Sequence, residues 1–293
     1  LILTAGPSIS QKEIDYVTDA IKTGWNEKSY YYMRKFESEF AKHIGVKYAR
    51  VTSGGTGALW LGLAVLGVGL GDEVILPEIT YFSCSDVIML LGAKPVFVDV
   101  LPDTWCIDPE KVEKAITKRT KAIMPVHIYG NPAEMDEIMV IAQKHKLYVV
   151  EDACPAVGTL YKGRKPGSFG DIGAFSFQGA KIMVTGFGGM IVTNDKKLFE
   201  KILYLNNHGE DHKKKFWQTS VGYTFELPNI SCALGLAQLE RIEEFVAKKR
   251  QLFDWYYERL GDIEGISMNY ERPNTRSNRW MSSIILDKDF GLD

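Results

Sequence analysis

Two short apolar segments flank a single lysine in residues 172–193, which are IGAFSFQGAKIMVTGFGGMIVT. The segments Ile172–Phe177 and Met190–Thr193 have the length and composition of buried strands. Lys181 lies between them, beside small residues that leave room for a planar group. Most lysines are solvated, but a partly desolvated amine loses some of its preference for the charged form and can act as a nucleophile and base. Lys181 is therefore the first candidate for a catalytic residue.

An alternation of strands and helices extends outward from this stretch. Four further apolar runs predict strands, and amphipathic spacing predicts helices between several of them. The expected strands are 74–76, 95–100, 122–126 and 147–150, and the expected helices are 13–23, 32–43, 58–66, 108–116 and 132–145. This order predicts an α/β fold with a mostly parallel sheet covered on both faces. Ligands of such sheets bind near the carboxyl ends of the strands.

The last sixty or so residues have a different character. A long helical pattern covers 229–260, and strand-like segments follow at 267–270 and 280–286. We expect a large domain at 1–240 and the start of a smaller C-terminal domain at 241–293. The sequence stops soon after an apolar run, so we expect this second domain to be incomplete.

The composition excludes several classes of protein. Of the 293 residues, 45% are hydrophobic and 25% charged, with a formal net charge of -2, which is typical of a soluble globular protein. This balance gives no reason to expect nucleic acid or an anionic membrane as a partner, and no apolar run is long enough to cross a bilayer. The cysteines are scattered and form no CxxC pair, so we expect no metal site, no disulfide framework and a cytoplasmic location.

Two other stretches contain candidate ligand-binding groups. Glu151 and Asp152 directly follow the expected strand 147–150, where a carboxylate either holds a proton on a ligand nitrogen or caps a loop. The glycine-rich residues 53–57 open the expected helix 58–66, so backbone N–H groups and the Thr56 hydroxyl can donate to a phosphate. We interpret His127, at the end of another strand, as a structural group.

These features together fit one cofactor, pyridoxal 5'-phosphate (PLP). PLP needs an amine for its aldehyde, a carboxylate for its pyridine nitrogen and donors for its phosphate. An aromatic ring usually stacks on the pyridine, and Tyr81 or Phe82 follows the strand 74–76.

In the order and spacing of these motifs, the chain resembles the DegT–StrS family of PLP-dependent sugar aminotransferases. It is most similar to the perosamine-synthase branch, which aminates nucleotide-linked 4-keto-6-deoxyhexoses. The matching stretches are GTGAL at 55–59, GDEVI at 71–75, EDA at 151–153, GDIG at 170–173, SF at 176–177 with Lys181, and GG at 188–189.

The resemblance implies fold type I, with a seven-stranded, mostly parallel sheet in the large domain and a smaller α+β domain after it. It implies that Lys181 binds the PLP aldehyde and Asp152 pairs with the pyridine nitrogen. The phosphate would be held by Gly55, Thr56 and Ser176, and Tyr81 would stack on the ring. The substrates implied are glutamate and a nucleotide-linked keto-deoxysugar, in amino-sugar biosynthesis for a polysaccharide such as O-antigen.

Family members are homodimers with shared active sites, which implies that segment 222–229, with Asn229, reaches the neighbour's cofactor. The chain departs from the family's usual residues at Gly54, Pro155, Phe187, Thr224 and Glu226. Two alternatives stay open: an aminocyclitol (keto-inositol) aminotransferase, and a non-catalytic PLP-binding relative. A nicotinamide dehydrogenase is excluded because the glycines at 67–71 follow a helix and precede a strand, the reverse of the dinucleotide fingerprint.

Overall fold

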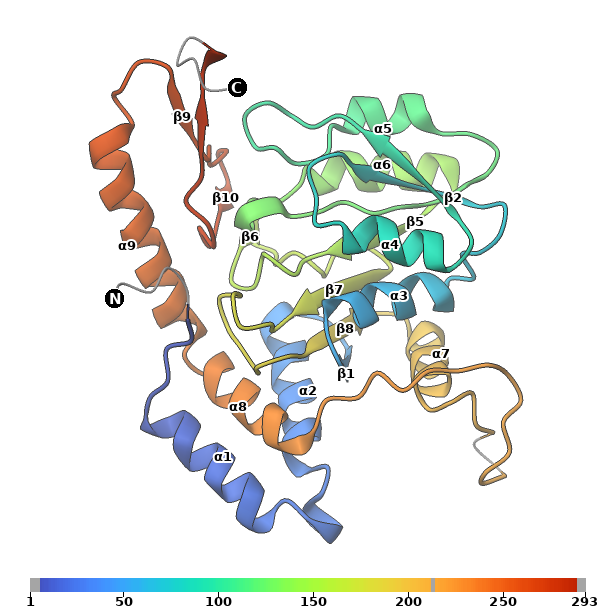
Figure 1. The fold of residues 1–293 in the computed structure, drawn as a ribbon. Coiled ribbons are helices and arrows are strands. Elements are labelled where there is room, and N and C mark those ends of the chain that lie inside the picture. Colours follow the sequence, from blue (N-terminus) through green and yellow to red (C-terminus); the bar gives the residue numbers. More distant parts are fainter. Residues whose placement is uncertain (1–5, 212–213, 289–293) are drawn as a thin grey trace.

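A central seven-stranded sheet organises the chain, with strand order β1-β8-β7-β5-β4-β2-β3 (Figure 1). The computed structural model describes residues 6–211 and 214–288. Strand β8 runs antiparallel to both of its neighbours, β7 and β1, whereas the other strand pairs of this sheet are parallel. The strands are β1 Tyr48–Thr52, β2 Glu73–Pro77, β3 Lys94–Val98, β4 Thr120–Ile123, β5 Tyr148–Asp152, β7 Ile172–Ser176 and β8 Gly189–Thr193. The expected α/β fold with a mostly parallel sheet is confirmed.

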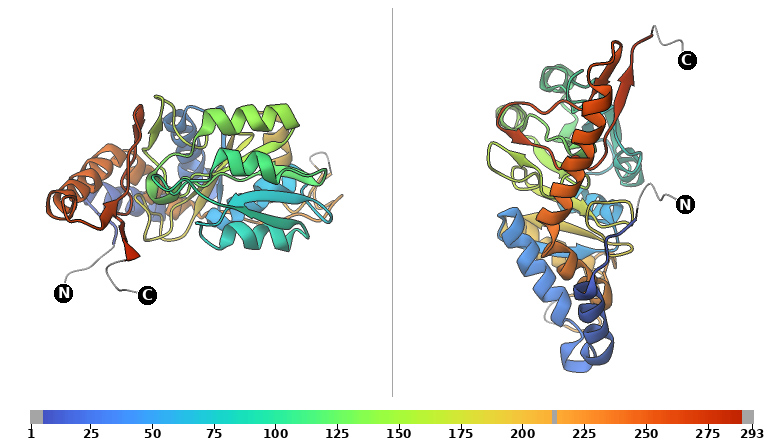
Figure 2. Two further views of the ribbon diagram at one scale, coloured as in Figure 1. Left: turned by 90° about the horizontal axis from the view of Figure 1, so that it is seen from above. Right: turned by 90° about the vertical axis from the view of Figure 1, so that its left-hand side faces the viewer.

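Helices cover both faces of this sheet, as the apolar strands require (Figure 2). Helix α3 packs against β5, β7 and β8, whereas α5 packs against β2 and β3 and α6 against β5. Helices α1 and α2 both pack against α8. The helices are α1 Gln11–Thr23, α2 Tyr31–Ile44, α3 Gly55–Val65, α4 Ser83–Leu90, α5 Pro109–Ala115, α6 Met135–His145, α7 Lys196–Asn206, α8 Asn229–Leu239 and α9 Ile242–Leu260, with short 3₁₀ turns η1 Asn26–Lys28 and η2 Ile128–Gly130.

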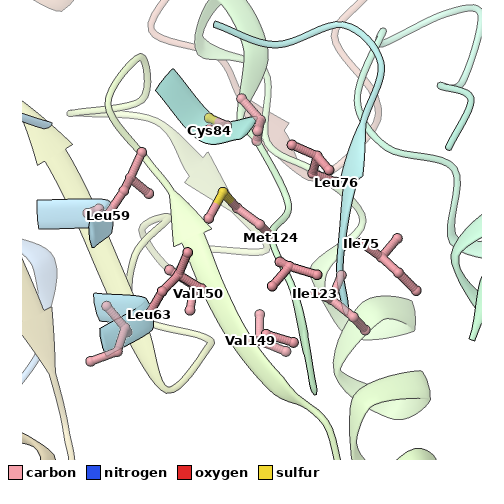
Figure 3. Packing of buried hydrophobic residues seen from close by; sticks show 14 of the residues in the cluster. Leu59, Leu63, Ile75, Leu76, Cys84, Ile123, Met124, Val149 and Val150 are labelled. Carbon is pink, nitrogen blue, oxygen red and sulfur yellow. The ribbon is translucent and has the colours of Figure 1, made fainter. Parts of the chain in front are cut away.

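The main core lies between α3 and the parallel strands (Figure 3). Helix α3 is apolar around almost its whole circumference, which suits a helix buried between other elements. Gly62 allows it to approach the sheet, because an added Cβ would lie 2.9 Å from Ile172 Cγ2. Leu59, Leu63 and Val150 are fully buried there, and burying each such side chain stabilises the fold by about 1.5–3 kcal/mol.

Two local features of the structure differ from the expectations. Strand β1 was not predicted, because its tyrosine and arginine interrupt the apolar run; it forms by pairing with β8. The single helix predicted at 229–260 is wrong: α8 ends at Leu239 and α9 begins at Ile242. At this break, Arg241 leaves the helical conformation and forms ion pairs with Glu13 at 2.7 Å and Glu244 at 3.1 Å.

The C-terminal segment lies beside the large sheet (Figure 1). Strand β9 (Ile266–Met268) pairs with β11 (Ile284–Leu286), which is shorter than the predicted strand 280–286. Strand β10 (Thr275–Arg276) pairs with β6 (Leu160–Tyr161) of the larger part. The expected domain boundary after residue 240 coincides with the turn between α8 and α9. The division into domains at 1–240 and 241–293 stays a prediction. Within the described ranges, no helix is both long and apolar enough to cross a bilayer.

Candidate active site

A cavity of about 610 Å³ opens at the carboxyl edge of the sheet, where α/β folds bind their ligands. It is bordered by the N-terminus of α3, the segments after β2, β4, β5 and β7, and the segment before β11. Six of the seven predicted site residues line it: Gly55, Thr56, Tyr81, Asp152, Ser176 and Lys181. Elements far apart in the sequence therefore meet at one site.

Strand alternation separates the two adjacent carboxylates at the end of β5. Glu151 is fully buried, and its oxygens accept hydrogen bonds from the backbone N–H groups of Gly167, Phe169 and Gly170, each at 2.7 Å. Its fourth partner is His127, with Nε2 at 3.1 Å from Oε2. Glu151 is thus a structural residue that holds the loop at 167–170.

His127 has a defined role in this arrangement. Its Nδ1 accepts a hydrogen bond from the Ala133 N–H at 3.1 Å. The ring proton is therefore on Nε2, which donates a hydrogen bond to Glu151. The ring is fully buried. Its burial and these contacts support the interpretation of His127 as a structural group.

Asp152 lies on the other face of the strand end and lines the cavity. Its side chain is nearly buried and is held at both oxygens. Oδ1 accepts from the Cys154 N–H and Oδ2 from the Cys84 thiol, both at 3.0 Å. Because a carboxylate oxygen can accept two hydrogen bonds, each retains acceptor capacity for a ligand.

The N-terminus of α3 forms the opposite part of the site. Gly54 occupies the N-cap position and supplies no capping side chain, so no side chain caps the first-turn N–H groups. A Cβ added to Gly55 would lie 2.8 Å from Cys154 Sγ and 2.9 Å from Ser176 Cβ. This close approach requires glycine and brings the helix N-terminus, the Thr56 hydroxyl and Ser176 together. Such an arrangement favours binding of an anion.

Lys181 follows β7 in a turn closed by its backbone N–H, which donates to the Gln178 carbonyl at 2.8 Å. Its side chain is half-buried, and Nζ lies 3.9 Å from the ring centroid of Trp280. The indole N–H of Trp280 donates to the Ala180 carbonyl at 2.8 Å, which fixes the ring next to the lysine. The amine therefore faces an aromatic ring and the cavity that also contains Asp152.

Trp280 was missed as a site residue in the sequence. It reaches Lys181 because Asn278 anchors its segment: Nδ2 donates to the Pro155 and Val157 carbonyls, each at 2.9 Å. The Asn278 Oδ1 also accepts from the Trp280 N–H at 2.9 Å. No local pattern indicates this contact, since it joins segments about a hundred residues apart.

Asn229 does not line this cavity. Its Oδ1 accepts from the backbone N–H groups of Tyr32 at 2.9 Å and Met33 at 3.3 Å, at the start of α2. Its expected contact with a neighbour's cofactor stays a prediction.

Tyr81 lines the cavity but is 63% exposed, and its ring centroid lies 4.4 Å from that of Phe82.

The five departures from the family's usual residues fall in two places. Gly54, Pro155 and Phe187 line the cavity. Thr224 and Glu226 lie outside it, where the Thr224 hydroxyl is 2.7 Å from His208 Nε2 and Glu226 pairs with Arg50 at 3.0 Å.

Comparison with known proteins identifies the family. The pattern of the DegT/DnrJ/EryC1/StrS aminotransferase family matches residues 7–290. The chain belongs to this family. It is 44% identical over 262 residues to the GDP-perosamine synthase of Caulobacter vibrioides, covering 89% of this chain and 71% of that protein. It is 40% identical over 279 residues to the GDP-perosamine synthase of Escherichia coli O157:H7, covering 95% and 76%.

The structure of 3-amino-5-hydroxybenzoic acid synthase superposes with a TM-score of 0.92 at 32% identity, covering 97% of this chain and 76% of that one. The expected fold type I architecture is thereby confirmed. The chain is an aminotransferase of this family, and its cofactor is PLP.

The site fits this cofactor. Lys181 offers an amine for the aldehyde, Asp152 a buried acceptor for the pyridine nitrogen, and the α3 N-terminus with Ser176 donors for the phosphate. The missing Cβ at Gly55 leaves the space in which the phosphate donors converge.

Proposed function

We propose that this aminotransferase moves an amino group from glutamate to the keto carbon of a nucleotide-linked 4-keto-6-deoxyhexose. Two relatives at 40% and 44% identity, both named GDP-perosamine synthase, support this substrate class. The observation that carries the proposal is the convergence of Lys181, Asp152 and the α3 N-terminus on one cavity. The product would be an amino sugar for polysaccharide biosynthesis.

Each residue then has a distinct task. Bound PLP supplies an electron sink for the charge that develops when the substrate loses a proton. Lys181 Nζ would take the proton from the α-carbon of glutamate and pass it to the cofactor in the first half of the reaction. In the second half it would move a proton the opposite way, onto the sugar carbon that receives the amino group. The Asp152 carboxylate holds the proton on the pyridine nitrogen. The first-turn N–H groups of α3, Thr56 and Ser176 bind the phosphate, and Tyr81 covers the ring.

We also propose that two copies of the chain form a homodimer with shared active sites. At the cavity, the Phe187 side chain is 74% exposed and the Tyr81 side chain 63% exposed in a single chain. Such apolar surface beside a binding site is typical of an interface. Segment 222–229 would extend from one copy toward the neighbour's cofactor.

A cytoplasmic location is consistent with the four cysteines, which are all free and buried.

The visible absorption of the PLP-loaded protein tests this function. Glutamate should bleach the band, and a GDP-linked 4-keto-6-deoxyhexose should restore it with release of an amino sugar. Recovery only with a keto-inositol would favour the aminocyclitol alternative. A band that glutamate leaves unchanged, while PLP stays bound, would identify a non-catalytic relative.

A further inference from the structure

The thiol of Cys84 contacts the carboxylate that we assign to the cofactor nitrogen. Cys84 belongs to α4 and is fully buried in the main core (Figure 3). Asp152 lines the cavity. The Cys84 Sγ lies 3.0 Å from Asp152 Oδ2.

The direction of this hydrogen bond follows from the state of the two groups. Burial raises the pKa of the Cys84 thiol well above its usual range, and the negative charge of Asp152 adds to the shift. The thiol therefore keeps its proton at neutral pH and donates a hydrogen bond to the carboxylate. Asp152 accepts at the other oxygen from the Cys154 N–H, so both oxygens are fixed.

We propose that Cys84 is a positioning residue, whose thiol orients Asp152 toward the cofactor nitrogen. The inference rests on the proposed role of Asp152. Side chains such as Met124 and Leu76 belong to the same apolar cluster as Cys84 (Figure 3), so a lost donor would not be replaced by water from that side. Without the thiol, Oδ2 would lose its partner, and the carboxylate could turn away from the nitrogen.

Three variants and one control separate this role from a packing effect. Cys84→Ala removes the donor, and Cys84→Ser restores a donor of similar size. Cys106→Ala deletes an equally buried thiol of the same core cluster, whose Sγ lies 3.5 Å from the Asn131 carbonyl rather than near Asp152. Asp152→Asn tests the carboxylate itself.

Two readouts are measured for each purified variant: the Kd for PLP by absorbance titration, and the pH midpoint of the visible band of bound PLP. We expect Cys84→Ala to weaken PLP binding roughly 3- to 10-fold, as for the loss of one hydrogen bond. We expect its pH midpoint to move by about 0.5 unit. Cys84→Ser and Cys106→Ala should stay within about twofold of the native Kd.

The outcomes distinguish this inference from the proposed function. If Asp152→Asn weakens PLP binding but Cys84→Ala behaves like Cys106→Ala in both readouts, the positioning role is overturned and the assignment of Asp152 stands. Failure of Cys84→Ser to recover the native values would also overturn it. If Asp152→Asn binds PLP with native affinity and an unchanged pH midpoint, both the assignment of Asp152 and the role of Cys84 fall.

Discussion

Gly55 offers the sharpest test of the phosphate site, because the structure predicts opposite results for two neighbouring glycines. A Cβ added to Gly55 would lie 2.8 Å from Cys154 Sγ and 2.9 Å from Ser176 Cβ. A Cβ added to Gly54 would have nothing within 4 Å, and the φ of Gly54, 174°, is an extended value that any residue adopts. Both glycines line the same cavity. Gly54→Ala is therefore a matched control for Gly55→Ala.

The size of the effect follows from the contact distances. Carbon atoms pack best at about 3.5–4.0 Å, so both new contacts at Gly55 would be roughly 0.6 Å or more too short. Ser176 ends a buried strand, and the backbone N–H of Cys154 holds Asp152, so neither neighbour can move freely. Overpacking of this kind costs about 1–3 kcal/mol. Because the helix N-terminus must shift, we expect Gly55→Ala to weaken PLP binding by about 10-fold or more.

Titration of each purified variant with PLP, followed by absorbance, measures this effect, and urea unfolding of the PLP-free proteins measures stability. Gly54→Ala should bind PLP within about twofold of the native protein, with a free energy of unfolding changed by less than about 0.5 kcal/mol. Equal PLP affinities for the two alanine variants would refute the proposed geometry of the phosphate site.

Three further predictions concern the amine, the ring beside it and the dependence on pH. Lys181→Ala should abolish transamination while the protein keeps its unfolding midpoint; retained turnover with glutamate would remove Lys181 from the mechanism. Trp280→Leu should lower kcat more than Trp280→Phe, because phenylalanine keeps an aromatic face over Lys181 Nζ; equal kcat values would contradict this. Burial lowers the pKa of His43 from 6.5 to about 4, and the Lys165 ammonium adds to the shift. The neutral ring therefore contributes stability above pH 6.5 that is lost as pH falls through about 4, at up to about 1.4 kcal/mol per pH unit. His43→Gln should consequently lose less stability than the native protein between pH 7 and pH 4 in urea unfolding, and parallel pH profiles would exclude this effect.

Much of the cofactor site follows from sequence alone, because its parts are local. Each of three motifs occupies only a few adjacent residues: a glycine-rich turn before a helix, a carboxylate after an apolar strand, and a lysine after a second apolar strand. The edge of a parallel sheet then brings the three together, as Gly55, Asp152 and Lys181 show. The alternation of strands and helices similarly predicts the sheet, because buried parallel strands are apolar along their whole length.

Tertiary structure decided what local patterns do not contain. Strand alternation requires Glu151 and Asp152 to face opposite ways, but only the packed loop at 167–170 determines that Glu151 is the structural one. The contact of Trp280 with Lys181 depends on the anchoring of a distant segment, and the break between α8 and α9 coincides with ion pairs at Arg241. These contacts join residues far apart in the chain, so their energies depend on packing geometry rather than on neighbouring sequence.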